Sequence, residues 1–388
     1  LALLSMGIRS PVQAISVPKT SWPACSETRT TYCVESVSVT AIGSKAEQLV
    51  WVPSGTAAPA PTSTAPAPPA QVTTASGATE LSGRWTSADW AANGHGLFGY
   101  DGLLVDAKAA NAFTNHLFID VRPIKVDASN KAFLATLNEK PTYAAALNPD
   151  VTVTAKLRIG EAIPGVTMAI SQNQLITKGS DATGNFVIMS GNPTPVAVAA
   201  KASDCTGESG VAAANTNQIQ LFVVTENDDM GFGIDGLTGR MAISSNGSCG
   251  LSTPVWDSAS KTMVWSAAAP HFAADGTTVN QGFYHAVIPA ADAKLLWGLQ
   301  NPNDAASALT ITVTNEAGGA TAAATKVSVR NGNIIIDSTG FHYSKPTFKI
   351  TKNKKYKPKP FTITCVKGKA TKKVTGTAPK CPSGFKQR

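Results

Sequence analysis

The last 44 residues, Lys345 to Arg388, contain thirteen lysines and one arginine, with neither aspartate nor glutamate. The whole chain has 33 basic and 25 acidic residues, so the preceding 344 residues carry a net charge of −6 and this tail carries +14. Such a tail attracts polyanions over about 8–10 Å at physiological salt. We predict that it binds them through Lys352, Lys354, Lys355, Lys357, Lys359, Lys367, Lys369, Lys372, Lys373 and Lys380.

The composition of the tail favours one kind of polyanion. Arginine, the better reader of bases and phosphates, is nearly missing from it. Lysines act as point charges and suit a flexible polymer of phosphates or carboxylates, such as a wall teichoic acid. We therefore expect anionic cell-wall polymers as partners and no nucleic acid. A disordered, solubilising tail is the alternative, but a cysteine pair, alternating β-formers and four aromatic residues count against it.

Six cysteines fall into three neighbourhoods and indicate an exported, oxidised protein. Six cysteines permit fifteen pairings, of which the sequence-local one is simplest. No C-x-x-C motif occurs, and no cysteine lies beside a histidine at zinc-finger spacing, so we expect no metal site at the cysteines. The expected disulfide partners are Cys25 with Cys33, Cys205 with Cys249, and Cys365 with Cys381.

Other acidic and histidine residues could bind a metal or take part in catalysis, but their spacing matches no specific motif. An acidic cluster could bind calcium, although it lacks EF-hand spacing and a solvated loop is the reading we favour. A histidine–aspartate group could belong to an exported hydrolase, but neither G-x-S-x-G nor H-E-x-x-H occurs, so we expect no enzyme. The acidic cluster is Glu226, Asp228, Asp229 and Asp235, and the second group is His271, Asp275, His285 and Asp292.

Two G-x-G-x-x-G runs, at residues 94–99 and 231–236, are better explained as turns than as a dinucleotide site. Neither run closes a strand and opens a helix, so we expect no cofactor. Four aromatic residues near the first run could line a sugar-binding face, although core packing is commoner for such residues. They are Trp85, Trp90, Phe98 and Tyr100.

The elements that must position these groups are mostly strands. Runs rich in β-branched residues alternate with a period of two and are separated by Gly, Asn, Asp or Pro. Asn331-Gly332 predicts a two-residue hairpin turn. Helical pattern is sparse, at residues 107–113, 131–137 and 290–299. The strand-like runs are residues 151–159, 185–189, 218–225, 261–265, 308–314, 326–330 and 333–337.

We predict a mainly β protein whose body is an antiparallel β-sandwich, one large or two stacked, with a small disulfide-stapled hairpin as its tail. Residues 1–14 predict the remnant of a signal peptide, with a first strand as the alternative. No stretch of 18 apolar residues occurs, so no membrane span is expected. The remaining divisions are a small N-terminal β module at 15–52, a Pro/Ala/Thr linker at 53–80, the body at 81–344 and the tail at 345–388.

The two ends of the chain carry a resemblance. Thr362 to Lys386 resembles a short, basic, two-cysteine ending of secreted proteins of actinobacteria, and Cys25 through Val39 is similar to their N-terminal Cys–Cys-Val-Glu-Ser-Val element. The resemblance implies export and residence at the surface, and it assigns no activity to Leu81–Tyr343.

These observations together indicate a non-enzymatic, exported cell-envelope protein in the cell wall or at the cell surface. Its lysine-rich tail would hold the β-rich body to anionic polymers of the envelope. A carbohydrate-binding or adhesive surface module is the alternative, and an exported hydrolase is the third hypothesis.

Overall fold

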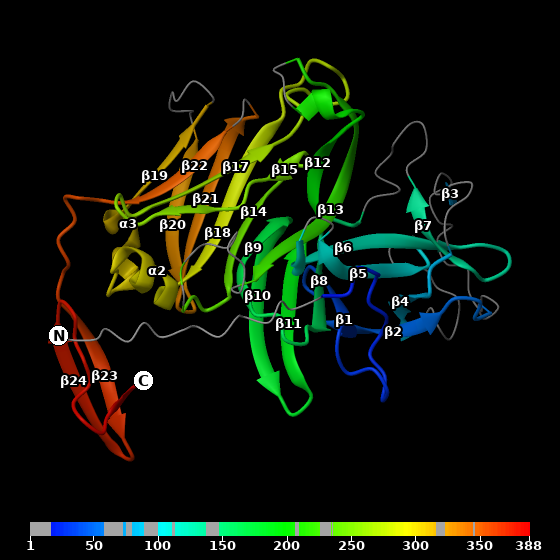
Figure 1. Ribbon diagram of the computed structural model, residues 1–388. Helices are drawn as coiled ribbons and strands as arrows, with labels where there is room; N and C mark the ends of the chain where they lie inside the picture. Colours follow the sequence, from blue (N-terminus) through cyan, green and yellow to red (C-terminus); the bar gives the residue numbers. More distant parts are fainter. Residues whose placement is uncertain are drawn as a thin grey trace, which may run out of the picture.

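Strands dominate the computed structural model of the chain (Figure 1). The mainly β class predicted from the sequence is therefore confirmed. In β8 (Val151–Arg158), Val153 and Ala155 are buried while Thr152 and Thr154 are only half-buried, as alternation predicts. The structure describes residues 17–57, 73–74, 80–88, 100–110, 113–136, 147–205, 209–225, 234, 236–315, 323–343 and 346–388.

Pairings join seventeen strands into one continuous sheet. Its first part is antiparallel from neighbour to neighbour. The order is β10 (Gln172–Asp181), β11 (Gly184–Asn192), β8, β1 (Cys33–Ala41), β2 (Glu47–Pro53), β4 (Gly83–Ser87), β5 (Gly102–Ala110), β6 (Phe113–Val126), β13 (Ala212–Thr225) and β9 (Pro164–Ile170). Three strands pair beside this path, namely β12 (Thr194–Ala199) with β13, β7 (Ala132–Thr136) with β6, and β3 (Thr73–Thr74) with β7.

The first hydrophobic core lies within this part of the sheet. β1, β8 and β11 contribute buried residues such as Val37 and Leu157, and β5, β6 and β13 contribute others such as Val105, Ile119 and Leu221. Because β2 and β4 separate these two groups of strands along the sheet, the sheet must curve to bring both groups to one core. Burial of this apolar surface contributes about 25 cal/mol per Å² to stability.

The sheet continues through β9, whose parallel pairing with β14 (Met241–Ser245) is the one parallel ladder among the described strands. Beyond β14 the order is β18 (Gln281–Pro289), β21 (Asn333–His342) and β20 (Ala324–Arg330), all antiparallel. A separate five-stranded sheet consists of β19 (Leu309–Thr314), β22 (Thr347–Lys352) and β17 (Thr262–Ala268), with β15 (Gly250–Leu251) and β16 (Val255–Asp257) both paired to β17.

A second hydrophobic core lies between these two sheets. Trp265 and Phe348 approach it from the five-stranded sheet, and Tyr284 and Phe341 approach it from β18 and β21. Helix α2 (Ala290–Trp297) covers one end, where the Trp297 indole is buried and donates to the Lys261 carbonyl at 3.0 Å. The other helices in the part of the chain that the structure describes are the short η2 (Ala202–Cys205), η3 (Pro302–Asp304) and α3 (Ala305–Ala308).

Two of the three helical predictions are wrong. Residues 107–113 lie largely in β5, and 131–137 contain β7, whereas α2 matches the prediction at 290–299. Ala107 and Ala109 are buried against the first core and pair with Ile119 and Leu117 of β6, so packing overrides the helical preference of alanine.

The predicted hairpin turn between β20 and β21 is present. Asn331 and Gly332 have φ angles of 50° and 73°, the left-handed conformation that a tight two-residue turn requires.

Strands near both predicted module boundaries belong to the body. β1 pairs along its length with β8, so the segment after Cys33 is part of the first core. β22, which we assigned to the tail, is a central strand of the five-stranded sheet, between β17 and β19. The predicted signal remnant at 1–14 and most of the linker, including 58–72, lie outside the described residues.

Three disulfides join the cysteines as the local pairing predicted, Cys25–Cys33, Cys205–Cys249 and Cys365–Cys381. In the part of the chain that the structure describes, no helix is long and apolar enough to span a bilayer.

Candidate polyanion-binding site

The C-terminal residues form a small sheet of their own, which projects from the body in Figure 1. We call residues 357–388 the basic module. β23 (Phe361–Lys367) pairs with β24 (Ala370–Gly376) and with β25 (Lys386–Gln387). Ile363 and Cys365 are its buried apolar residues, and the Cys365–Cys381 disulfide closes the loop that follows β24. A sheet of this size has little core, so the disulfide is an important part of its stability.

Both faces of this sheet carry lysines. Residues directly opposite in an antiparallel pair share a face. Lys372 lies opposite Cys365 on the disulfide side, where its Nζ is 5.2 Å from the centroid of the Phe385 ring. Lys373, opposite Thr364, shares the other face with Lys386. Positive charge is therefore available to a polymer from either side of the module.

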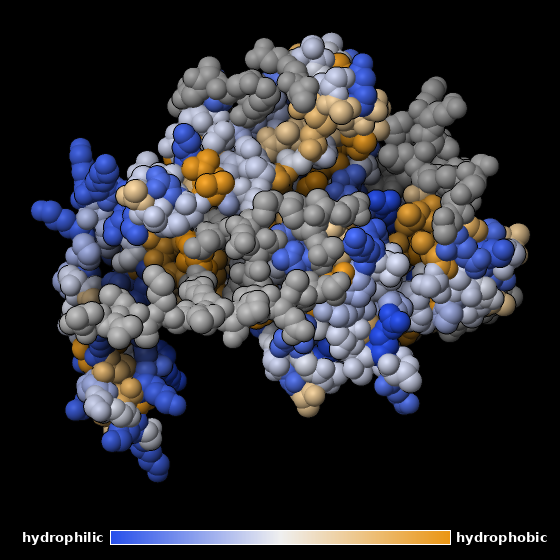
Figure 2. Space-filling view, viewed as in Figure 1, coloured by the Kyte–Doolittle hydropathy of each residue, from blue (hydrophilic) through white to orange (hydrophobic). Residues whose placement is uncertain are grey.

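The structure places the ten predicted lysines in two groups. Lys352 ends β22, and Lys354 and Lys355 lie in the turn that follows it. The other seven belong to the basic module. Nine of the ten side chains are exposed and Lys352 is half-buried. Figure 2 shows hydrophilic side chains projecting from the module at the lower left.

Neighbouring carboxylates do not neutralise these ammonium groups. Within the described ranges, none of the ten lysines forms an ion pair, whereas lysines of the body such as Lys108 and Lys156 do. The ion pairs of the body neutralise part of its charge within the body itself. The lysines of the module remain available for an external polyanion.

The turn after β22 is firmly attached to the body. Tyr356 packs against the second core, and its hydroxyl donates to the Asp304 carboxylate at 2.6 Å. Burial, and to a smaller extent the hydrogen bond and charge of Asp304, raise the pKa of Tyr356 to about 12. The chain between Tyr356 and Phe361 is therefore the connection between body and module.

The histidines and aspartates of the hydrolase hypothesis have separate partners. The Asp275 carboxylate accepts from the backbone amides of Thr277 and Thr278, as a turn residue does. Asp292 is fully buried and accepts from the amide and the hydroxyl of Thr238, both at 2.8 Å. His271 contacts Phe272 edge to face. Among the described residues, no contact joins these groups to His285.

His285 has a different carboxylate partner, which sequence reasoning missed. Its Nδ1 lies 2.6 Å from the Asp337 carboxylate on the neighbouring strand. Ser244 lies opposite His285 on the other side, so serine, histidine and aspartate share one face of three adjacent strands. The Ser244 side chain is fully buried, however, and its hydroxyl points to the His285 carbonyl at 3.4 Å. A nucleophilic serine must be accessible to substrate and hydrogen-bonded to its histidine. The Ser244 hydroxyl meets neither condition in this geometry.

A metal site is not found among the described residues, where no group of three histidines, cysteines, aspartates or glutamates could hold an ion. The acidic cluster from Glu226 to Asp235, for which we weighed calcium, lies outside the described residues.

The hypothesis of an aromatic sugar-binding face is wrong for the two of its residues that the structure describes, because both are packed in the interior. Trp85 is 5% exposed and packs against Trp51 within the first core, and Tyr100 is 3% exposed. Burial raises the pKa of Tyr100, which agrees with an interior hydroxyl. Trp90 and Phe98 lie outside the described residues.

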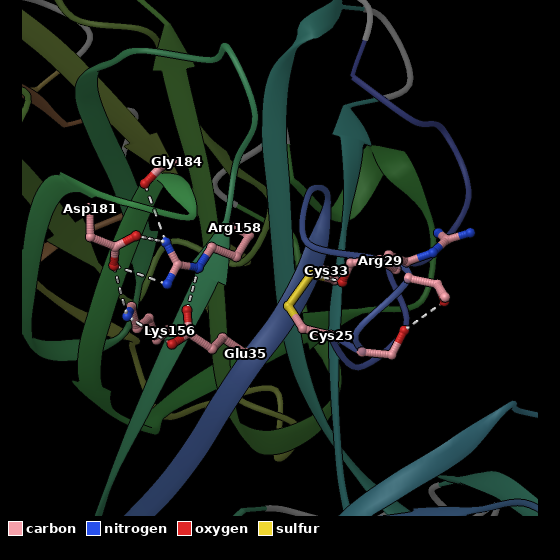
Figure 3. The surroundings of a disulfide bond; sticks show 10 residues. Cys25, Arg29, Cys33, Glu35, Lys156, Arg158, Asp181 and Gly184 are labelled. Atoms are coloured by element: carbon pink, nitrogen blue, oxygen red, sulfur yellow. Dashed lines mark hydrogen bonds and ion pairs between the residues drawn. A yellow bond between two sulfur atoms is a disulfide. The ribbon is translucent and has the colours of Figure 1, made fainter.

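A buried arginine network, also missed from the sequence, lies beside the first disulfide. Figure 3 shows the Arg158 guanidinium between the carboxylates of Asp181 and Glu35. Arg158 donates to both Asp181 oxygens, at 2.7 and 3.0 Å, and to the Gly184 carbonyl. Lys156 bridges the same two carboxylates, at 2.8 Å to Glu35 and 3.7 Å to Asp181. The network links β1, β8 and β10, so its role is structural.

Asp181→Asn should destabilise the protein in a pH-dependent way. Hydrogen bonds from Arg158 lower the pKa of Asp181 to about 2. A depressed pKa contributes stability above the unfolded value near 4, and this contribution is lost as the pH falls through 2. The Tm difference between wild type and variant, measured by circular dichroism, should have its largest value at pH 6 and decrease below pH 4. Asp150→Asn, in an exposed turn, is the control. A Tm difference that is constant from pH 6 to pH 2.5 would contradict the assignment.

A second pair of carboxylates lies on the outer side of the curved sheet. Asp106 and Asp120 are directly opposite on β5 and β6, and both are buried. Burial raises the pKa of Asp120, an effect that its ion pair with Arg122 opposes. Lys108 pairs with Asp106 at 2.7 Å. Each carboxylate is thus paired with its own basic side chain, and we assign the group a structural role.

In the comparisons with known proteins, no family model, no curated protein and no solved structure matches this chain.

Proposed function

We propose that this chain is an exported, non-enzymatic protein of the cell envelope, held electrostatically to anionic envelope polymers by its basic module. The observation that carries the proposal is the separation of charge. Exposed lysines without described acidic partners cover a small disulfide-closed sheet. Residues 357–388 hold nine basic and no acidic residues, whereas the preceding 356 residues hold 24 basic and 25 acidic residues, a net charge of −1. The three disulfides support an oxidising, extracytoplasmic location.

A flexible polymer is the partner that this geometry favours. Lysines on both faces of the module suit a chain that wraps around it more than a flat, rigid surface. Ammonium groups neutralise phosphates or carboxylates singly, without the fixed fork of arginine. Many moderate contacts of this kind act together and are reversed by salt. The body would then be displayed outside the polymer layer.

Charge removal from the module tests the proposal. The probe is soluble poly(glycerol phosphate), titrated into the full-length protein by calorimetry at 50 and 200 mM NaCl. In the test variant Lys367, Lys369, Lys372 and Lys373 become glutamine. By analogy with single-stranded nucleic acid, each lost contact should reduce the slope of log K against log salt by about 0.7. We expect affinity at 50 mM NaCl to fall by at least tenfold.

The matched control removes the same charge from the body. Lys45, Lys201, Lys294 and Lys326 are exposed, and none has an ion pair among the described residues. Their replacement by glutamine should leave affinity within about twofold, while the net charge of both variants is the same. Equal binding by the two variants, or no binding by the wild type at 50 mM NaCl, would refute the tether.

A further inference from the structure

A cavity of about 320 Å³ lies where the first part of the seventeen-stranded sheet meets the second part. Its walls come from β10, β12, β13 and β18 and from the connections that follow β14, β17 and β21. It therefore combines strands of the curved first part of the sheet with strands of the second part. Small-molecule sites of about 300–1,000 Å³ occur preferentially at such junctions.

The chemistry of the walls is uncharged and rich in carboxamides. No lysine, arginine, aspartate, glutamate or histidine is among the described residues that line the cavity. Phe283 offers a half-exposed aromatic ring, whereas Tyr343 and Thr194 are buried and their hydroxyls bond to Asn246 and Gln172. The five amide side chains are Gln172, Asn215, Asn246, Asn280 and Gln281.

Two of these amides are fixed and build the walls. Asn246 donates to the Gln281 carbonyl at 3.0 Å, and its oxygen accepts from the Phe283 amide and from the Tyr343 hydroxyl. Asn280 donates to the Pro270 carbonyl at 2.7 Å. These bonds hold the beginning of β18 and the end of β21 in place. A ligand would meet a preformed surface, which reduces the entropy cost of binding.

Two other amides have capacity left for a ligand. The side chains of Asn215 and Gln281 both line the cavity, and neither has a hydrogen-bond partner among the described residues. A carboxamide offers two donors and an acceptor with two lone pairs. Gln172 uses only its amide nitrogen, which donates weakly to the Thr194 hydroxyl at 3.4 Å. Donors and acceptors thus stand side by side on the walls.

Covalent and hydrogen-bonded links tie the two sides of the cavity together. The Cys205–Cys249 disulfide joins the chain after β12 to the chain after β14. Ser248 donates to the Ala197 carbonyl on the cavity wall. The backbone of Phe272 bridges to Val211 before β13. The junction between the two parts of the sheet is therefore held in place, which favours a permanent pocket over a transient gap.

We propose that this cavity binds a neutral saccharide unit. Sugar hydroxyls both donate and accept, as adjacent amides do, and the C–H face of a pyranose can pack on the Phe283 ring. The absence of charged groups from the described walls disfavours anions and cations alike. The site is separate from the basic module, and neutral-saccharide binding does not depend on the tether.

Titration with neutral oligosaccharides tests this proposal. The probes are the hexamers of β-1,4-linked glucose, α-1,4-linked glucose, β-1,4-linked N-acetylglucosamine and α-1,6-linked mannose, each added to the full-length protein in a calorimeter. We expect at least one to bind with a Kd below 5 mM. The double variant Asn215→Ala/Gln281→Ala should weaken that binding at least tenfold, because it removes both unpartnered amides and leaves the wall bonds of Asn246 and Asn280.

Two controls make the result specific. Gln48→Ala removes an exposed amide from β2, in the first core region, and should leave the Kd within twofold. The Tm of the double variant should stay within 3 °C of the wild type, which separates lost recognition from lost folding. Binding should also be the same at 50 and 500 mM NaCl, unlike binding to the basic module. Failure of all four sugars to bind, or equal binding by the double variant, would overturn the proposal.

Discussion

Trp265→Ala is expected to lower the free energy of unfolding by about 3–5 kcal/mol, the range for deletion of a large buried aromatic side chain. The indole is 2% exposed and lies between the two sheets that enclose the second core. Its ring centroid is 4.4 Å from that of Phe348 and 5.8 Å from that of Tyr284. Alanine would leave a cavity among aromatic rings that are held by strands on both sides and cannot collapse far. Urea denaturation followed by circular dichroism measures the change.

Two further variants separate the physical contributions at this position. The Trp265 Nε1 atom is buried and has no hydrogen-bond partner among the described residues. Trp265→Phe removes this unpaired donor and leaves a smaller cavity, so it should cost less than half as much as alanine. Trp256→Ala, at a half-buried indole that contacts Trp297 from β16, should also cost less. A loss below about 1 kcal/mol for Trp265→Ala would contradict the position of Trp265 in the core.

Local pattern was enough to predict strands such as β8, β13 and β21, whereas β6, β9 and β10 were not predicted. Ile334 and Ile336 are buried and alternate with half-buried neighbours in β21, and the Asn331-Gly332 turn precedes them directly. Both features depend on residues that are close in sequence. The local cysteine pairing succeeded for the same reason at Cys25–Cys33, with a separation of 8 residues.

Features that depend on distant partners could not be predicted. The alanines of residues 107–110 have a helical preference, and only the neighbouring strand β6 and the core beneath it make them a strand. The composition of β22 assigns it to the lysine-rich tail, yet its residues Phe348 and Ile350 are buried in the second core. The curvature that brings β1 and β5 to one core also has no local sequence signal.

The two candidate sites differ in the same way. The basic module is contiguous, so counting charges finds it and alternation predicts its strands. The neutral cavity takes its lining from four strands and three connections, between Gln172 and Tyr343. Asn215 and Gln281 are ordinary polar residues in the sequence. Only the pairing of strands into one sheet and the contact between its two parts bring them to one cavity.

Removal of the C-terminal disulfide by Cys365→Ser/Cys381→Ser should unfold the basic module and leave the body intact. The bridge closes a loop of 16 residues, for which chain entropy predicts about 3 kcal/mol of stabilisation. Ile363 is the other buried apolar side chain of this small sheet, so hydrophobic burial alone cannot replace the contribution of the disulfide. Hydrogen exchange measured by mass spectrometry should show loss of protection at residues 361–376. Protection at residues 333–343, in β21, should be unchanged.

The same variant separates charge from shape in the proposed tether. All eight lysines of the basic module remain, so an electrostatic tether should keep its affinity for poly(glycerol phosphate) within about tenfold and keep its dependence on salt. Cys25→Ser/Cys33→Ser is the matched control, because Cys33 begins β1 and is fully buried in the body, where the Arg158 network lies nearby. That control should lower the Tm of the body and leave exchange at 361–376 unchanged. Persistent protection of residues 361–376 in the Cys365→Ser/Cys381→Ser variant would show that the strands of the module are stable without the disulfide. A complete loss of affinity would show that binding requires a fixed arrangement of ammonium groups, against a tether made of independent charges.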